Sequence, residues 1–251
     1  MSVAVDHPAP GVARIRIDRP DARNAIDASV RSGLFGALEE ARLDAGVRGV
    51  VLGGTGGMFC AGGDLPSLVG LDEAAAYARL CDGHRIVALL WTFPKPVVAA
   101  VERFAVGAGA GLALLADRVV MGEGAVVSFP FARLGLVPDW GLGGTLPRRI
   151  GPERAARRFA EAASVKAGEA LGLGLADTVT ADATVMAEAI DAAARLAKAA
   201  PGAFARTKLR LRGDAGVLQL EREARDQAAC LASPEFAEGY AAFREKREPR
   251  F

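Results

Sequence analysis

Two glycine-rich stretches, Phe59-Cys-Ala-Gly-Gly-Asp-Leu65 and Gly107-Ala-Gly-Ala-Gly111, are the most informative parts of this sequence. Each follows a short apolar run, residues 47–52 and 96–101, whose pattern predicts a buried strand. Small residues at such turns let one backbone approach another backbone, or a ligand, closely. The second turn also opens a helix, and the first N–H groups of a helix lie unpaired at its positive end. These features predict that a ligand approaches the backbone at the two turns.

An N–H group at the second turn and another from Gly62-Gly63 are placed to converge on one point. Two converging N–H groups form an oxyanion hole, which stabilises negative charge developing on a carbonyl oxygen. Neither turn is a convincing phosphate loop. The glycines at residues 53–57, which lead into the first turn, lack the Lys-Ser/Thr pair of that motif. Residues 107–111 fit the dinucleotide spacing only loosely. For either turn taken singly, the alternative that its glycines serve only tight packing of the backbone remains open.

Outward from these turns, strands alternate with helices in the first half of the chain and helices fill the second half, which predicts an α/β fold. Residues 13–18 alternate as a half-buried strand, and Asp27 is placed to cap a helix with one apolar stripe. Further strands are expected at residues 117–121 and 125–129. Helices are expected at residues 72–90, 155–163, 183–199, 201–212, 217–231 and 234–246.

Composition bounds the compartment and the partners. The chain has 251 residues, 51% of them hydrophobic, so a sizeable core can be buried. The formal net charge of +1 argues against nucleic acid as a partner. Three cysteines without paired spacing favour a reduced, cytoplasmic setting. No secretory segment opens the sequence and no uncharged run is long enough to span a membrane, so no membrane association is expected.

Six motifs, in order and at the usual spacing, resemble the crotonase (enoyl-CoA hydratase/isomerase) superfamily along essentially the whole chain. They are Asp18-Arg-Pro-Asp-Ala-Arg-Asn-Ala25, Phe59-Cys-Ala-Gly-Gly-Asp-Leu65, Lys95-Pro-Val-Val-Ala-Ala-Val101, Gly107-Ala-Gly, Leu134-Gly-Leu-Val-Pro-Asp139 and Phe243-Arg-Glu-Lys-Arg-Glu-Pro-Arg-Phe251. One departure is Glu102-Arg103, where the family commonly has Asn-Gly. The resemblance implies a spiral of ββα units over residues 1–195 that binds acyl-CoA, and a C-terminal helical trimerisation region over residues 196–251.

The resemblance also assigns roles to individual residues. It places the oxyanion N–H groups at Gly63 and Ala108. The residues expected at coenzyme A and the acyl group are Arg23, Ala61, Asp64, Leu65, Phe131, Trp140, Phe243 and Lys246. Coenzyme A is part of the substrate, so no separate cofactor and no metal are expected. The family assembles as trimers or dimers of trimers, and an apolar set expected to stay uncovered in one chain fits this: Val217, Leu218, Leu220 and Leu231.

The acids of the family's hydratases are missing. Two glutamates share the work there, and the positions that match them by motif are Gly111 and Phe131, neither of which can transfer a proton. One acid remains, Asp139, which is expected just inside the helix that follows Pro138. Without the resemblance, a carboxylate favoured by the helix dipole would be the simpler interpretation. With it, the pattern is closest to the enoyl-CoA isomerases that use a single acid.

Moving a double bond from C3 to C2 requires one base, which takes a proton from C2 and returns it at C4. Val137, Trp140 and Phe131 are expected to form an apolar wall that raises the pKa of Asp139. Asp139 is therefore the predicted proton shuttle of an isomerase. The alternatives are a hydratase with another acid pair, thioester hydrolysis or dehalogenation with Asp139 as nucleophile, and a non-catalytic CoA-binding homologue.

Other reactive side chains are predicted to be structural. Glu123 lies in a Gly-Glu-Gly turn, which favours a solvated carboxylate over a second pocket acid. Cys60 is more consistent with a small buried apolar residue than with a nucleophile. His7 is expected near a mobile N-terminus and His84 in a helix, and both are expected to be structural or surface residues.

Overall fold

The structure, a computed structural model, describes residues 2–251 and contains two sheets. The larger sheet has, in spatial order, β1 (Val3–Ala9), β2 (Val12–Ile17), β3 (Gly49–Gly54), β4 (Val97–Val101), β6 (Arg118–Gly122) and β9 (Thr178–Thr180). Only β1 runs antiparallel to its neighbour. The smaller sheet has the order β5 (Phe104–Val106), β7 (Val126–Ser128) and β8 (Ser164–Lys166).

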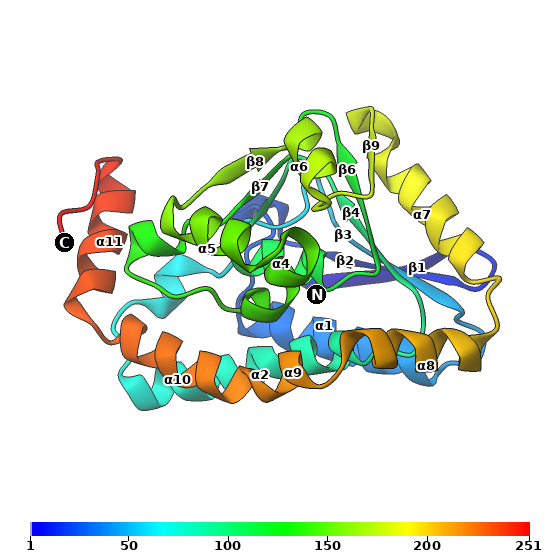
Figure 1. Cartoon of the computed structure of the whole chain (residues 1–251), viewed down its shortest axis with the longest axis horizontal. Helices are drawn as coiled ribbons and strands as arrows, with labels where there is room; N and C mark the ends of the chain where they lie inside the picture. The colour runs from blue at the N-terminus through cyan, green and yellow to red at the C-terminus, as the bar shows by residue number, and fades with distance from the viewer. Residues whose placement is uncertain (1) are drawn as a thin grey trace.

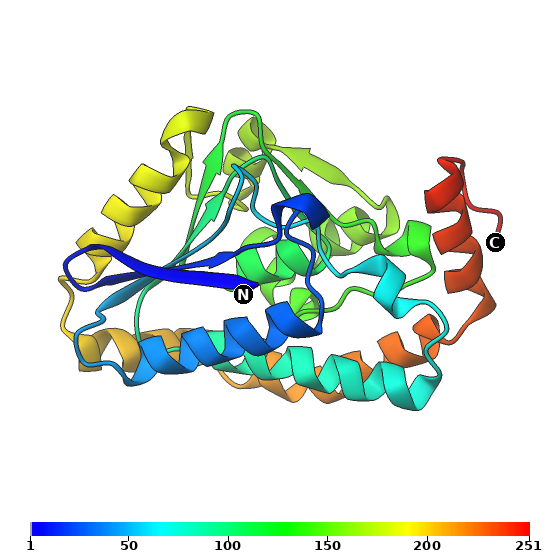
Figure 2. The same cartoon turned by 180° about the vertical axis from the view of Figure 1, so that it is seen from behind.

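Helices cover both faces of the larger sheet (Figures 1 and 2). Their bounds are α1 (Ala28–Leu43), α2 (Glu73–Trp91), α3 (Ala108–Leu114), α4 (Leu142–Ile150), α5 (Pro152–Ala160), α6 (Ala167–Leu173), α7 (Val185–Leu196), α8 (Pro201–Arg212), α9 (Ala215–Leu218), α10 (Leu220–Leu231) and α11 (Pro234–Glu245). One-turn 3-10 helices lie at η1 (Pro20–Ala22), η2 (Leu65–Leu68), η3 (Phe131–Leu134) and η4 (Asp182–Thr184). No helix among the described residues is both long and apolar enough to cross a membrane.

The central strands are buried on both sides, which explains their nearly continuous apolar sequences. On one face β2, β3, β4 and β6 pack against α7 through small and β-branched side chains. On the other face they pack against α1, α2 and α3 in the main core. The strands at 47–52 and 96–101 that the sequence predicts are therefore present, as β3 and β4.

The sequence misses several short or polar strands. β1 carries His7 and pairs with β2, so the expectation of a mobile N-terminus around His7 is wrong. The three-residue strands β5, β8 and β9 are too short to show a period of two. β5 stands between β4 and the second glycine turn, so two successive strands, in different sheets, lead to that turn.

The C-terminal helices fold back over the rest of the chain. α10 lies along α2, and α11 packs on η3 at the far end of the molecule (Figure 1). A Cβ added at Gly239 of α11 would stand 2.6 Å from the Leu134 carbonyl carbon, so only glycine permits this approach. α11 is thereby held beside the loop that carries Asp139.

The apolar set expected to stay uncovered is partly wrong. Leu220 and Leu231 are buried against α2 and its neighbours within the single chain. Leu218 is 76% exposed, as expected, and Leu211 of α8, which was not in the expected set, is 73% exposed.

Candidate active site

The two glycine-rich turns lie side by side because the start of the first stretch, at Cys60, runs parallel to β5. Cys60 forms a bridge with Ala105, and the Val106 N–H donates to the Cys60 carbonyl at 3.1 Å. Gly62 adopts φ +95°, and a Cβ there would stand 2.7 Å from the Val106 carbonyl oxygen. The approach of the two turns therefore requires glycine at this position.

The turns present two backbone N–H groups to one cavity. Gly63 and Ala108 both line it, and Ala108 is the first residue of α3 after Gly107. Neighbouring N–H groups are used elsewhere: Gly62 donates to the Cys60 sulfur and Asp64 to the Ile26 carbonyl. Within residues 2–251, no acceptor is assigned to the N–H of Gly63 or of Ala108. This is the arrangement that an oxyanion hole needs.

The turn between β4 and β5 has Arg103 at the position where the family commonly has glycine. Arg103 adopts φ +60°, and its carbonyl accepts from the Val126 N–H. A non-glycine residue pays a modest strain in this left-handed conformation. The Glu102-Arg103 departure therefore leaves β5 and the second turn in place.

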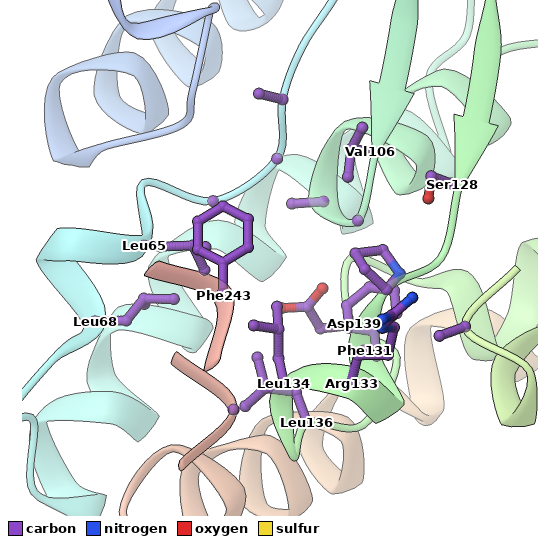
Figure 3. A pocket seen from close by; sticks show the side chains of 18 of the residues that line it. Leu65, Leu68, Val106, Ser128, Phe131, Arg133, Leu134, Leu136, Asp139 and Phe243 are labelled. Atoms are coloured by element: carbon purple, nitrogen blue, oxygen red, sulfur yellow. The ribbon is translucent and has the colours of Figure 1, made fainter. Parts of the chain in front are cut away.

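The cavity below these turns has a volume of about 710 Å³ (Figure 3). Nine residues predicted for the site line it: Ala61, Gly63, Leu65, Ala108, Phe131, Asp139, Trp140, Phe243 and Lys246. Arg23 and Asp64 do not. Arg23 ends η1 in a left-handed conformation, and Asp64 precedes η2, where its carbonyl accepts from the Ser67 hydroxyl.

Asp139 lies in the loop before α4 rather than inside a helix, so that expectation is wrong. Trp140 and Gly141 both adopt positive φ, 55° and 72°, and α4 begins only at Leu142. The loop turns the Asp139 carboxylate into the cavity (Figure 3). Its Oδ1 is buried and has no hydrogen-bond partner among the described residues, while Oδ2 accepts from Gln227 Nε2 at 3.2 Å.

Burial raises the pKa of Asp139 to about 7, and repulsion from Glu223 adds to the rise. The Gln227 hydrogen bond opposes it. Trp140 and Phe131 are themselves buried at the cavity wall, as the sequence predicts. The carboxyl group is therefore poised to exchange a proton near neutral pH.

A second set of groups supports Asp139, and the sequence does not reveal it. Glu223 of α10 accepts from the Gly141 N–H at 3.0 Å and lies 2.9 Å from His84 Nε2 of α2. Gln227, one turn further along α10, also accepts from the Val137 N–H at 3.0 Å. His84 lies on a helix, as the sequence predicts, and is buried there. The i, i+4 spacing of Glu223 and Gln227 is the only sequence signal, and it does not identify their partners.

The position of the first missing hydratase acid has no room for a side chain. A Cβ at Gly111 would stand 2.6 Å from Trp140 Cβ and 2.7 Å from its carbonyl oxygen. The second, Phe131, is buried with its ring edge-on to Phe159. The loop carrying Asp139 therefore occupies the space that an acid on α3 would require.

Two other candidates lie as the sequence predicts. Glu123 is exposed and outside the cavity. Cys60 is fully buried, and burial raises the pKa of its thiol to about 12, which keeps it protonated. No group of three or more potential metal ligands occurs among residues 2–251.

The sequence profile described as enoyl-CoA hydratase/isomerase matches residues 8–251. The chain belongs to this family. It is 35% identical over 246 residues to the 2,3-dehydroadipyl-CoA hydratase of Escherichia coli, covering 96% of this chain and 94% of that protein. The crystal structure of an enoyl-CoA hydratase from Mycobacterium avium subsp. paratuberculosis K-10 superimposes with a TM-score of 0.88 at 32% identity, covering 100% and 98% of the two chains.

A second solved structure, an enoyl-CoA hydratase/isomerase from Pseudoalteromonas atlantica T6c, has a TM-score of 0.89 at 31% identity and covers both chains fully. The predicted crotonase-like α/β fold with its C-terminal helical region is thereby confirmed. The chain is an enzyme of the enoyl-CoA hydratase/isomerase family. The family includes both hydratases and isomerases, so membership alone does not assign the reaction.

Proposed function

We propose that this enoyl-CoA hydratase/isomerase family member moves the double bond of a 3-enoyl-CoA to the 2-position, with Asp139 as the proton shuttle. The supporting observation is a single buried carboxyl group with a pKa of about 7 in the cavity that also receives the Gly63 and Ala108 N–H groups. One base and one oxyanion hole are the groups that this reaction needs.

The reaction proceeds in two proton transfers. The Asp139 carboxylate takes a proton from C2, and the C–H electron pair enters the conjugated system as a dienolate. Its negative charge rests on the thioester oxygen, to which Gly63 and Ala108 donate. Neutral Asp139 then returns the proton at C4, which regenerates both the carboxylate and the thioester. Asp139 must therefore reach C2 and C4 on the same face of the acyl chain.

Hydration is the second candidate, because two of the three relatives described above are named hydratases. It needs a group to activate water as well as one to protonate the α-carbon. The other carboxylate lining the cavity is Glu248, which is exposed and paired with Arg133. Glu223 is paired with His84 behind the loop. These contacts favour isomerisation over hydration.

Products formed from 3-hexenoyl-CoA and from 2-hexenoyl-CoA, separated by liquid chromatography, distinguish the two reactions. An isomerase converts the first substrate to the second much faster than it forms 3-hydroxyhexanoyl-CoA from either. Faster hydration would contradict the proposal. Tight binding of both acyl-CoAs without turnover would indicate a non-catalytic CoA-binding protein.

The activity should rise with pH through the pKa of Asp139, near 7, because the carboxylate is the base. Replacing Glu223 with Gln keeps an acceptor for the Gly141 N–H but removes the repelling charge. The acid limb of the kcat/KM profile should therefore move to lower pH. Replacing Gln227 with Met removes the hydrogen bond to the carboxylate and should move the limb to higher pH.

The two changes give opposite shifts only if both groups act on Asp139 through its charge. Profiles recorded with one substrate across pH 5–9 measure them, with unfolding monitored over the same range. Shifts of the same sign in both variants would show that general disturbance of α10, rather than electrostatics, sets the pH dependence.

We also propose that Lys246, exposed at the mouth of the cavity beside Phe243, binds a phosphate of coenzyme A. Lys246→Ala should raise the Kd for free CoA roughly fivefold at low salt, the scale of an exposed charge-assisted contact. Turnover at saturating substrate should hardly change, because Lys246 takes no part in the proposed proton transfers. Calorimetric titration measures the affinity, and an unchanged Kd would remove Lys246 from the binding site.

The protein is further proposed to assemble as a trimer or a dimer of trimers. The exposed leucines Leu211 and Leu218 on consecutive helices supply apolar surface for such contacts. Sedimentation at micromolar concentration should show at least three copies of the 26.0 kDa chain. Leu211→Asp should weaken the assembly, whereas a monomer in the wild type would contradict it.

A further inference from the structure

Four arginines line the same cavity as Asp139. Arg133 pairs with Glu248, and Arg247 with Glu238 and Glu245. The other two have fewer partners, and the proposed reaction uses neither. Arg31 is on α1 and Arg79 on α2. Arg79 and Gly83 are four positions apart and so share one helical face. A Cβ at Gly83 would lie 3.4 Å from the Trp140 ring and 3.7 Å from Arg31 Cδ, which places Arg31 beside the loop of Asp139.

Arg31 is buried and only partly neutralised. Its Nε donates to Asp82 Oδ2 at 2.8 Å, an acid that is itself 44% exposed at the side chain. No partner is assigned to its two terminal nitrogens within the described chain. A buried guanidinium presents five donors, so most of this one is left for other contacts.

Arg79 has no assigned hydrogen bond or ion pair within residues 2–251, although it is more buried than exposed in the cavity wall. Burial lowers its pKa, and the like charge of Arg31 lowers it further. An arginine rarely sits in such a place without a partner, because burying an unpaired charge is costly. Two cations thus face one cavity with few partners.

The acids that face Arg79 are Asp64, Asp27 and Asp139. None of the three forms an ion pair with Arg79 within the described chain. Asp27 caps α1 at the Val30 N–H and lies 3.3 Å from Arg19. Asp139 has a pKa raised to about 7, so much of it is neutral at that pH. The positive field at Arg79 therefore has no counter-ion in direct contact.

The cavity also suits an alkyl chain, because its wall includes several leucines: Leu65, Leu68, Leu80, Leu134, Leu136 and Leu231. An apolar cavity whose wall also carries the Arg31 and Arg79 guanidinium groups matches a chain that is apolar in the middle and anionic at its end. Carboxylate geometry fits the two-pronged donation of arginine.

We propose that Arg79, assisted by Arg31, binds a carboxylate at the distal end of the acyl group, so that the substrates are acyl-CoAs with an ω-carboxylate. The inference builds on the proposed function only in taking acyl-CoA as the ligand of this cavity. It does not require that the reaction be isomerisation.

Affinity for three unreactive ligands tests it: hexanoyl-CoA, its ω-carboxy counterpart adipyl-CoA, and free CoA. The wild type should bind adipyl-CoA more tightly than hexanoyl-CoA. Arg79→Gln should weaken adipyl-CoA binding about tenfold or more, as for a lost charge-assisted pair. Binding of hexanoyl-CoA and of free CoA should stay within about twofold. The matched control is Arg85→Gln, on the same helix but outside the cavity.

Each other outcome overturns the proposal. Equal wild-type affinity for adipyl- and hexanoyl-CoA would show that no distal carboxylate is recognised. A similar loss for all three ligands in Arg79→Gln would assign Arg79 to a phosphate of coenzyme A. Because these titrations involve no turnover, failure to isomerise 3-enoyl-CoA leaves their outcome untouched, and the two proposals can fail separately.

Discussion

Replacing Asp139 with Asn is expected to reduce isomerase turnover at least about 10²-fold, the usual scale for a positioned acid–base group. The amide keeps the size of the side chain and can still contact Gln227, but it cannot accept a proton from C2. Binding of a saturated acyl-CoA should change much less, because the Gly63 and Ala108 N–H groups and the cavity wall remain.

The same variant should be more stable than the wild type above neutral pH. Burial raises the pKa of Asp139 from 3.8 to about 7, so the folded state holds the proton more tightly than the unfolded state. Its stabilising contribution is complete below pH 4 and is lost as the pH rises through 7. Asparagine stays neutral throughout, so its advantage should be largest at pH 8 and on the order of a few kcal/mol.

Denaturant titrations at pH 5 and pH 8, with rates on 3-hexenoyl-CoA, measure both effects. Glu123→Gln is the matched control, since that acid is exposed and outside the cavity. It should leave rate and stability nearly unchanged. Rates like those of the wild type in Asp139→Asn would contradict the role of Asp139 as proton shuttle. If the stability difference between Asp139→Asn and the wild type were the same at pH 5 and pH 8, that would contradict a buried carboxyl with a raised pKa.

The second large effect is expected for Gly62→Ala, which should reduce turnover about 10²–10³-fold, the scale for losing an oxyanion donor. The added Cβ would stand 2.7 Å from the Val106 carbonyl oxygen, at a φ of +95° that disfavours alanine. Relief requires the first turn to move away from β5, and Gly63 must move with it. Both isomerisation and any hydration should fall together.

Gly57→Ala separates this collision from backbone strain. Gly57 also has positive φ, +66°, but nothing lies within 4 Å of an added Cβ. That variant should lose some stability and little activity. Thermal melts show whether each variant is folded at the assay temperature. A folded Gly62→Ala protein with full activity would show that this approach of the two turns is not needed for catalysis.

The regular elements were predictable where a long pattern marks them. α2 and α8 begin and end within about a residue of the ranges expected from their apolar periodicity, and β2 does the same. β5, β8 and β9 were not predictable, because three residues cannot establish a period. The helix expected at Asp139 was wrong, since Trp140 and Gly141 take left-handed conformations that postpone α4 to Leu142.

The sequence predicted residues that do line the cavity where a short motif of consecutive residues carries the signal. The glycine turns and the lack of acids at Gly111 and Phe131 are properties of short motifs, and so is the single aspartate after Pro138. The supporting groups could not be assigned in this way. Glu223 lies 139 positions from His84, and Gln227 lies 88 positions from Asp139.

The sequence alone was therefore enough to predict the family, the two glycine turns and Asp139 as the candidate acid of the site. The pKa of that acid depends on the tertiary structure. Burial raises it most, and α10, which packs along α2, brings Glu223 and Gln227 to the acid. The tertiary structure also decided that Arg31 and Arg79 share a cavity. Burial and charge pairing arise only when distant segments exclude water together, and no local pattern specifies which segments those are.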